Sequence, residues 1–264
     1  MIDIQALTKD LQIVRQKSPL IHNITNYVVM NNTANGLLAI GASPVMAHSV
    51  EEVAEMASIA SALVINIGTL EPAWVEAMLI AGKTAHKKGT PVVFDPVGVG
   101  ATTYRTKVCK QIIEECKPHI IRGNASEIMA LCNVNVQTKG VDSTNSSDSA
   151  LNSAKQLAKE TNSIVVVSGQ TDYITDGQNI NTVNNGNPMM ARVTGMGCTA
   201  TAIVAAFAAV NSNLLEAATH GMAIMGIAGE IAAHKSAGNG SLQPNFLDEL
   251  YNIDETIIKE TIKD

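Results

Sequence analysis

The feature that most constrains the fold of this chain is the alternation of short apolar runs with longer helical segments. The runs at 62–68, 91–96 and 163–168 are largely apolar, as strands covered on both faces are. Between them lie stretches such as 71–88 and 146–161, whose apolar residues recur at helical spacing. Strands that alternate with helices build a mostly parallel sheet. The sequence therefore predicts an α/β fold in three layers, with helices on both faces of a central sheet.

No linker, low-complexity run or internal repeat interrupts the 264 residues, so we expect a single domain over residues 1–264. Hydrophobic residues make up 46% of the chain and aromatic residues only 3%, which indicates a core of small and aliphatic side chains. The net charge of −6 and the lack of a basic run argue against nucleic-acid binding.

Neither a membrane span nor a secretory signal is visible in the sequence. No apolar stretch reaches the roughly 18 residues that a membrane helix needs. The first residues lack a basic segment followed by an apolar one. The four cysteines show no C-x-x-C spacing, so we expect reduced thiols and neither a disulfide frame nor a zinc site. A cytoplasmic location is the resulting expectation.

Hydrophobic periodicity and the positions of proline and glycine predict the element boundaries. Helices are expected at 3–17, 26–38, 50–61, 71–88, 104–115, 124–131, 146–161, 198–210, 213–235 and 246–260. Strands are expected at 19–23, 41–46, 62–68, 91–96, 119–122 and 163–168, with hairpins at 169–183 and a loop at 238–244.

Open parallel sheets bind ligands beyond the carboxyl ends of their strands, so residues at those ends are candidates for a site. They are Asn23, Met46, Asn66, Asp95, Arg122 and Ser168. The predicted helix 26–38 also contains four asparagines, which are mediocre helix formers. Either their amides are used in a site, or they cap and solvate the helix.

The glycine-rich stretch 194–199 leads into an apolar run of small residues that is predicted to be a buried helix. A glycine turn that opens a helix leaves backbone N–H groups unpaired, backed by the positive end of the helix dipole. We therefore expect an anion site at the backbone N–H groups of residues 195–198, in the turn made by Gly195 and Gly197. Cys198 has two interpretations. It is a small buried residue, or it is a general base whose thiol pKa is lowered by the helix N-terminus.

Three charged residues could complete such a site. Asp95 ends a buried strand beside a glycine-rich turn, so it could hold Mg²⁺ directly or through water, or simply form the turn. Glu127 follows in Asn124-Ala-Ser-Glu127, where it could be a second carboxylate for the metal or part of a helix capping box. Arg122 could clamp phosphate oxygens or form a surface ion pair.

General nucleotide motifs match poorly. The sequence contains no G-x-x-x-x-G-K-[ST] motif, which disfavours a P-loop kinase or ATPase. Gly195-x-Gly197-x-x-Ala200 matches the loose dinucleotide fingerprint, but it lies near the end of the chain, whereas a Rossmann fold has it early.

A set of motifs together resembles one family. They are Thr194-Gly-Met-Gly-Cys198, His22-Asn-Ile-Thr-Asn-Tyr27, Asp95-Pro-Val-Gly98, Arg122-Gly-Asn-Ala-Ser-Glu127 and Gly238-x-Gly-Ser241. From about residue 15 to 250 the chain resembles hydroxyethylthiazole kinases, members of the ribokinase-like superfamily. The resemblance implies a ribokinase-like fold and ATP-dependent phosphorylation of the hydroxyl of 4-methyl-5-(2-hydroxyethyl)thiazole, a salvage step toward thiamine. It also implies Mg²⁺ and a homotrimer with active sites at subunit interfaces.

The resemblance further implies roles for individual residues. Met46 and Gly195 fall at thiazole-binding positions, and Arg122 and Ser168 at nucleotide-binding positions. We add Asn23, as a residue at a strand end, to the expected substrate contacts. Asp95 and Glu127 are implied to organise Mg²⁺. Cys198 is implied to be nearest the reacting hydroxyl. With Gly195 and Gly197, whose turn is the expected anion site, it makes up the expected catalytic residues.

Two alternatives stay open at the level of sequence. The first is another ribokinase-like enzyme, such as a kinase of a different vitamin alcohol or an ATP-dependent nicotinamide-nucleotide hydrate dehydratase. The second is a non-catalytic protein of the same fold that binds a nucleotide or another small molecule.

Overall fold

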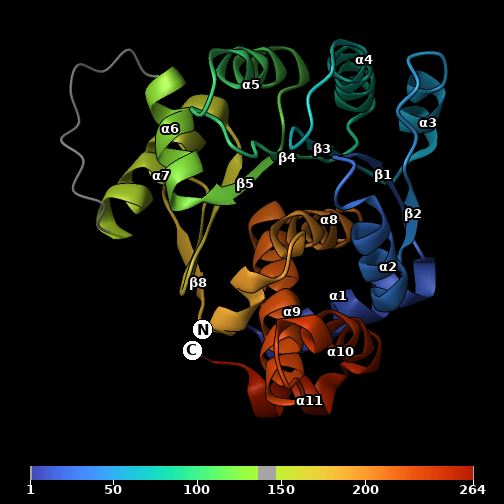
Figure 1. Cartoon of the computed structure of the whole chain (residues 1–264), viewed down its shortest axis with the longest axis vertical. Helices are drawn as coiled ribbons and strands as arrows, with labels where there is room; N and C mark the ends of the chain where they lie inside the picture. The colour runs from blue at the N-terminus through green and yellow to red at the C-terminus, as the bar shows by residue number, and fades with distance from the viewer. Residues whose placement is uncertain (1, 136–146, 264) are drawn as a thin grey trace.

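The computed structural model describes residues 2–135 and 147–263 of the chain. An eight-stranded sheet runs through it in the order β2-β1-β3-β4-β5-β6-β7-β8 (Figure 1). Strands β1 to β6 pair in parallel, and β7 and β8 add an antiparallel hairpin at one edge. The strands are Leu20–Ile24 (β1), Ser43–Val45 (β2), Ala62–Asn66 (β3), Val92–Asp95 (β4), Ile120–Asn124 (β5), Ile164–Ser168 (β6), Asp172–Thr175 (β7) and Ile180–Val183 (β8).

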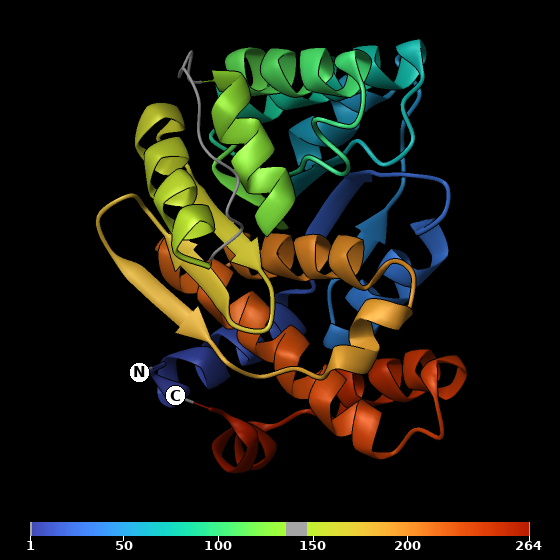
Figure 2. The same cartoon turned by 60° about the vertical axis from the view of Figure 1, so that its left-hand side comes forward.

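Helices form a layer on each face of this sheet (Figure 1). One layer contains Val53–Ile59 (α3), Pro72–Lys88 (α4), Thr103–Cys116 (α5), Ala125–Asn135 (α6) and Ser147–Thr161 (α7). The other contains Ile4–Lys17 (α1), Met30–Ile40 (α2), Met196–Ala208 (α8), Leu214–His234 (α9), Asn239–Asn252 (α10) and Glu255–Thr261 (α11). A short 3₁₀ helix, Pro188–Arg192 (η1), precedes α8. Figure 2 shows the β7–β8 hairpin lying along α9.

Burial on both faces explains why the strands are apolar throughout. In β3, Leu63 and Ile65 belong to the core under α3–α7. Ala62 and Val64, which alternate with them, belong to the core under α1, α2 and α8–α11. Since successive side chains of a strand point to opposite faces, a strand between two helix layers has no polar face. The predicted three-layer fold with a mostly parallel sheet is confirmed.

The predicted boundaries are wrong mainly in the last third of the chain. The expected loop at 238–244 is the beginning of α10, and the expected helix 246–260 is divided between α10 and α11. Glycine, serine and proline favour a loop here, but Leu242 and Phe246 are both buried in the core. Their packing outweighs the local propensities. None of the helices in the described part of the chain is long and apolar enough to cross a bilayer.

Candidate active site

The predicted strand-end residues meet at one edge of the sheet. Asn66 at the end of β3 pairs in register with Asp95 at the end of β4. Asn124 at the end of β5 pairs with Ser168 at the end of β6. Arg122, predicted to end its strand, lies two residues before the end of β5. Helix α8 packs against β3 and β4, so these strand ends and the start of α8 form one site.

The start of α8 presents free backbone donors. Gly195 is the N-cap residue and has a φ of 87°, a left-handed conformation that favours glycine. The first helical bond runs from the N–H of Thr199 to the carbonyl of Gly195, over 2.8 Å. The N–H groups of residues 196–198 therefore precede the helical ladder and can bind an anion. Cys198 lies in the first turn of α8, two residues after the helix begins.

Arg122 lies directly over this turn. A Cβ atom at position 197 would be 2.7 Å from Arg122 Nη1, so only glycine leaves room for the guanidinium. Arg122 Nη2 donates to Ser168 Oγ over 2.7 Å. Arg122 Nε is buried and has no partner. Gly197, Arg122 and Ser168 thus form a cationic corner with unused donors.

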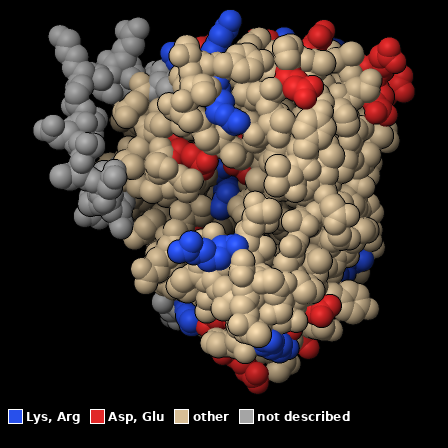
Figure 3. Space-filling view, in the orientation of Figure 1, with Lys and Arg blue, Asp and Glu red and all other residues tan. Residues whose placement is uncertain are grey.

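This corner opens into a cavity of about 750 Å³, a volume that suits a small-molecule ligand. Figure 3 shows a hollow near the middle of the viewed face, with basic and acidic atoms inside it. The cavity is lined by Arg122, Ser168, Gly169, Gln170, Asp172, Asn184, Asn185, Gly186, Asn187, Pro188, Met190, Ala191, Met196, Gly197, Ala200, Met222, Met225, Gly226 and Lys263. Burial raises the pKa of Asp172 to about 6.

Asp95 is almost completely buried and only half satisfied. Its Oδ2 atom accepts hydrogen bonds from Asn66 Nδ2, at 3.0 Å, and from Thr201 Oγ1, at 2.8 Å. Its Oδ1 atom is buried without a partner. Burial raises the pKa of Asp95 to about 6, although Arg122 acts in the opposite direction. A buried carboxylate oxygen without a hydrogen-bond partner costs free energy. This oxygen is therefore available to a metal ion or to a hydrogen-bond donor of a bound ligand.

Both carboxylate oxygens of Glu127 accept hydrogen bonds from backbone N–H groups. Oε2 accepts from the N–H of Asn124, and the Asn124 side chain accepts from the N–H of Glu127, both at 2.9 Å. This is the capping box that the sequence left as one of two possibilities. Oε1 accepts from the N–H of Gly98, also at 2.9 Å, which ties α6 to the turn after β4.

The expected lowering of the Cys198 pKa is wrong. Burial raises the pKa of the thiol to about 11, and the charge of Asp95 adds to this effect. Hydrogen bonds from Asn66 and Asn26 act in the opposite direction but do not compensate. Cys198 Sγ accepts one of these bonds from Asn26 Nδ2, at 3.5 Å. Near neutral pH the side chain is therefore a thiol, with the sulfur held by an amide.

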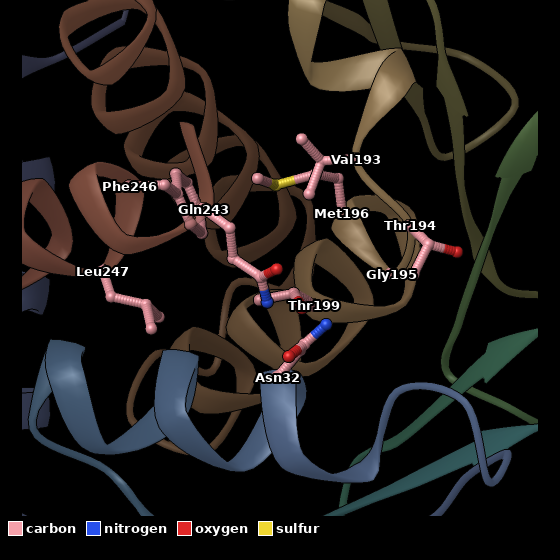
Figure 4. Close-up of a pocket in the computed structure, with 9 residues that line it drawn as sticks. All are labelled: Asn32, Val193, Thr194, Gly195, Met196, Thr199, Gln243, Phe246 and Leu247. Carbon is pink, nitrogen blue, oxygen red and sulfur yellow. The ribbon is translucent and has the colours of Figure 1, made fainter. Parts of the chain in front are cut away.

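The residues expected at the thiazole are not gathered in one cavity. Asn23 and Met46 line neither of the two cavities described for this chain. Asn23 is fully buried, and its Oδ1 atom has no partner. Gly195 lines a cavity of only about 10 Å³ between α2, α8 and α10, where Asn32 and Gln243 point inward and Thr194 points away (Figure 4). That space is about the size of one water molecule.

Sequence reasoning missed several residues of the site. Thr201, which bonds to Asp95, was not among the candidates. Asn26 was one of the four asparagines considered for a site, but it bonds to Cys198 from the loop before α2 and not from a helix. Thr201 lies about one helical turn after Gly197, which the spacing could have revealed. Nothing local marks Asn185, Met222 or Met225 as cavity residues, since they approach from elements late in the chain.

Comparison with known proteins shows which family this chain resembles. The model of the hydroxyethylthiazole kinase family matches residues 11–256. A hydroxyethylthiazole kinase of Leptospira biflexa is 53% identical over 254 residues, which are 96% of this chain and 95% of that protein. The structure of a hydroxyethylthiazole kinase protein from Pyrococcus horikoshii OT3 superposes with a TM-score of 0.92 at 41% identity and covers 98% of both chains.

A more distant structure supports the fold alone. A ribokinase-like superfamily protein from Enterococcus faecalis has a TM-score of 0.65 at 15% identity, over 93% of this chain and 88% of that one. The long family match and the close relatives decide the family. The chain belongs to the hydroxyethylthiazole kinase family.

Proposed function

We propose that this protein transfers the γ-phosphoryl group of ATP to the hydroxyl of 4-methyl-5-(2-hydroxyethyl)thiazole, a salvage step toward thiamine. The observation that carries the proposal is that three features lie where the strand ends meet the first turns of α8. They are the free N–H groups at the start of α8, the Arg122 guanidinium above them and the unpaired Oδ1 atom of Asp95. The identity of the alcohol substrate is inferred from the family to which the chain belongs.

Backbone and guanidinium donors are the proposed anion site of the reaction. Phosphoryl transfer needs positioning and charge stabilisation more than covalent chemistry. The N–H groups of residues 196–198 and Arg122 would stabilise charge on the transferred group. Arg122 and Ser168 line the cavity of about 750 Å³, where the nucleotide is proposed to bind.

Magnesium is proposed to be organised by Asp95 and Glu127. Within the described residues, no cluster of three or more His, Cys, Asp or Glu side chains could hold a metal ion. A pair of carboxylates with phosphate oxygens is nevertheless the usual Mg²⁺ arrangement in kinases. The unpaired Oδ1 atom of Asp95 could coordinate Mg²⁺ directly. Glu127 already accepts hydrogen bonds from two backbone N–H groups, so it would contact the ion through a water molecule. Bound Mg²⁺ would neutralise phosphate charge.

Cys198 is proposed to contact the substrate hydroxyl. A thiol with a pKa of about 11 is not a ready base at neutral pH. In a loose transition state the hydroxyl can lose its proton after the new O–P bond has largely formed, so a thiolate is not required. Cys198 would then orient the hydroxyl, while Gly195, Met46 and Asn23 are the proposed thiazole contacts. The unpaired Asn23 Oδ1 atom supports this assignment.

A homotrimer with active sites at its interfaces is also proposed. Val28 and Tyr27, which follow Asn26 at the site, are 65% and 53% exposed. Exposed apolar residues beside a site support an interface there. Sedimentation equilibrium should give about three times the 27.8 kDa of one chain, and a monomer mass would contradict the trimer. We further propose a single domain over residues 1–264 and a cytoplasmic location, where ATP is available.

A coupled ADP assay tests the function. Purified protein with ATP and Mg²⁺ is expected to release ADP rapidly only when the thiazole alcohol is present. Pyridoxal and other vitamin alcohols, tested at the same concentration, should give much lower rates. ATP binding without ADP release for any alcohol would instead favour a non-catalytic binding protein.

A further inference from the structure

Four polar side chains form a continuous hydrogen-bonded network across the site. Asn26 Nδ2 approaches Cys198 Sγ at 3.5 Å and donates to Asn66 Oδ1 at 2.9 Å. Asn66 Nδ2 in turn donates to Asp95 Oδ2 at 3.0 Å. The four residues come from the loop before α2, the ends of β3 and β4, and the first turn of α8. Two amides therefore connect the thiol to the carboxylate.

Two backbone N–H groups fix the orientation of the two amides in this network. The N–H of Gly68 donates to Asn66 Oδ1 at 2.9 Å, so the Asn66 amide must turn its NH₂ group toward Asp95. The N–H of Val28 donates to Asn26 Oδ1 at 3.2 Å, so the Asn26 amide must turn its NH₂ group toward Asn66 and Cys198. A backbone N–H cannot accept a hydrogen bond, and neither amide can flip without losing one.

The surroundings hold the two amides in place. Asn66 is fully buried, and Asn26 is 5% exposed. A Cβ atom at Gly68 would lie 2.4 Å from Asn26 Nδ2, so the Asn26 side chain packs directly against the backbone after β3. Arg105 binds the carbonyl of Ile67 at 2.6 Å and that of Gly68 at 2.9 Å, which fixes this backbone from the other side.

The fixed orientation of the two amides has a consequence at each end of the hydrogen-bonded network, at Asp95 and at Cys198. Asp95 Oδ2 accepts from both Asn66 and Thr201, so Oδ1 is the atom left free. Cys198 Sγ accepts from Asn26, so its own proton is free to point elsewhere. The same two amides thus set which carboxylate oxygen stays unpaired and from which side the sulfur accepts a hydrogen bond.

We propose that Asn26 and Asn66 are positioning residues that hold the Cys198 thiol and the Asp95 carboxylate in a fixed mutual orientation for phosphoryl transfer. This inference rests on the proposed kinase function. Neither amide lines the cavity of about 750 Å³, so their effect falls on the reaction step and not on nucleotide binding.

The first test is the Asn26→Ala variant. It removes the 3.5 Å contact of Asn26 Nδ2 with Cys198 Sγ and leaves Asn66 held by Gly68, so kcat should fall by about tenfold while the KM for ATP changes by less than about twofold. Asn211→Ala is the matched control. Asn211 Nδ2 donates to a carboxylate oxygen of Asp10 at 2.7 Å, far from the site, so its loss should leave kcat within about twofold of wild type.

A double-mutant cycle distinguishes positioning from general support of the fold. If Asn26 acts through Cys198, the tenfold effect of Asn26→Ala should shrink to less than about twofold in a Cys198→Ala background. An equal loss of kcat in both backgrounds would overturn the proposal. If Asn26→Ala does not fold, Asn66→Asp tests the other end. It keeps both accepted bonds but replaces the donor to Asp95, and should lower kcat at least about tenfold with an unchanged KM for ATP.

A spectroscopic readout does not depend on the kinase function. The S–H stretching band of Cys198, isolated by subtracting the infrared spectrum of Cys198→Ala, reports what the sulfur binds. Asn26→Ala should shift this band, and Asn211→Ala should not. An unshifted band would contradict the contact. A shifted band in a protein that does not phosphorylate the thiazole alcohol would preserve the contact and refute the function.

Discussion

Asp95 and Glu127 lie near the carboxyl ends of neighbouring strands, yet their surroundings are opposite. Glu127 has each oxygen on a backbone N–H group and completes the capping box of α6. Asp95 is buried to 1% exposure with Oδ1 unpaired. The difference teaches how to separate a structural carboxylate from a reactive one. A satisfied carboxylate stabilises the fold, whereas a buried, unsatisfied one costs stability and is available to a ligand.

The largest expected effect comes from Asp95→Asn. The amide has nearly the same shape, but it replaces a negative oxygen at the proposed metal and phosphate site. We predict that kcat falls by about 10³-fold. Steady-state kinetics over a range of Mg²⁺ concentrations measures this, and a loss of less than about tenfold would place the essential carboxylate elsewhere.

The next effect tests whether the anion site beside Asp95 depends on the glycine turn. Gly197→Val would push Arg122 away from the start of α8 and should lower kcat/KM by about 10²-fold or more. Gly238→Val is the control, because this glycine also opens a helix, its backbone is extended and a Cβ atom there has open space. Similar losses in the two variants would contradict a specific role for the turn.

A stability measurement tests the cost assigned to Asp95. Its pKa rises from 3.8 to about 6 on folding, so the native state binds the proton more tightly than the unfolded state. Stability therefore falls as pH rises between these values, by up to about 3 kcal/mol. In metal-free protein, Asp95→Asn should raise the free energy of unfolding near pH 7.5, and by about half as much near pH 5. Urea unfolding at both pH values checks this, and a destabilised variant would refute it.

Cys198→Ala should have a moderate effect. A neutral thiol that orients the hydroxyl contributes less than the donors around it, so we predict a loss of about tenfold in kcat. The measurement is kcat under saturating ATP and alcohol. Complete loss of turnover in Cys198→Ala, with Gly197→Val still active, would reverse the ranking of thiol and turn.

The smallest expected effect on activity belongs to Glu127→Gln. Glutamine keeps one acceptor oxygen and loses the charge, so kcat should fall by about tenfold or less. The free energy of unfolding should drop by about 1 kcal/mol through the weakened capping box. If kcat instead falls as far as in Asp95→Asn, the two carboxylates are equivalent and the comparison fails.

Much of the site was predictable because it lies where strands end. The apolar runs locate the ends of β3, β4 and β6, and parallel pairing then brings Asn66, Asp95 and Ser168 to one edge. Gly195 was predictable because a glycine-rich turn before an apolar run of small residues indicates the start of a buried helix. The functional reading of these residues depended on the family resemblance as well as on position.

Other features could not be predicted because they depend on burial and long-range packing. The helix N-terminus argues for a lowered Cys198 pKa, but the sequence does not show that the thiol is buried beside Asp95, which raises it. Of the asparagines expected in one helix, Asn26 lies before α2 and bonds to Asn66, while Asn31 and Asn35 bond to each other on its exposed face. Only the fold separates these uses.

The most direct test of the central claim follows the phosphoryl group itself. ATP labelled at the γ-phosphate is incubated with the protein, Mg²⁺ and the thiazole alcohol, and the products are separated by mass. We predict that the label appears on the thiazole phosphate ester in a one-to-one ratio with ADP. Label found as inorganic phosphate, with the alcohol unchanged, would contradict transfer to this substrate.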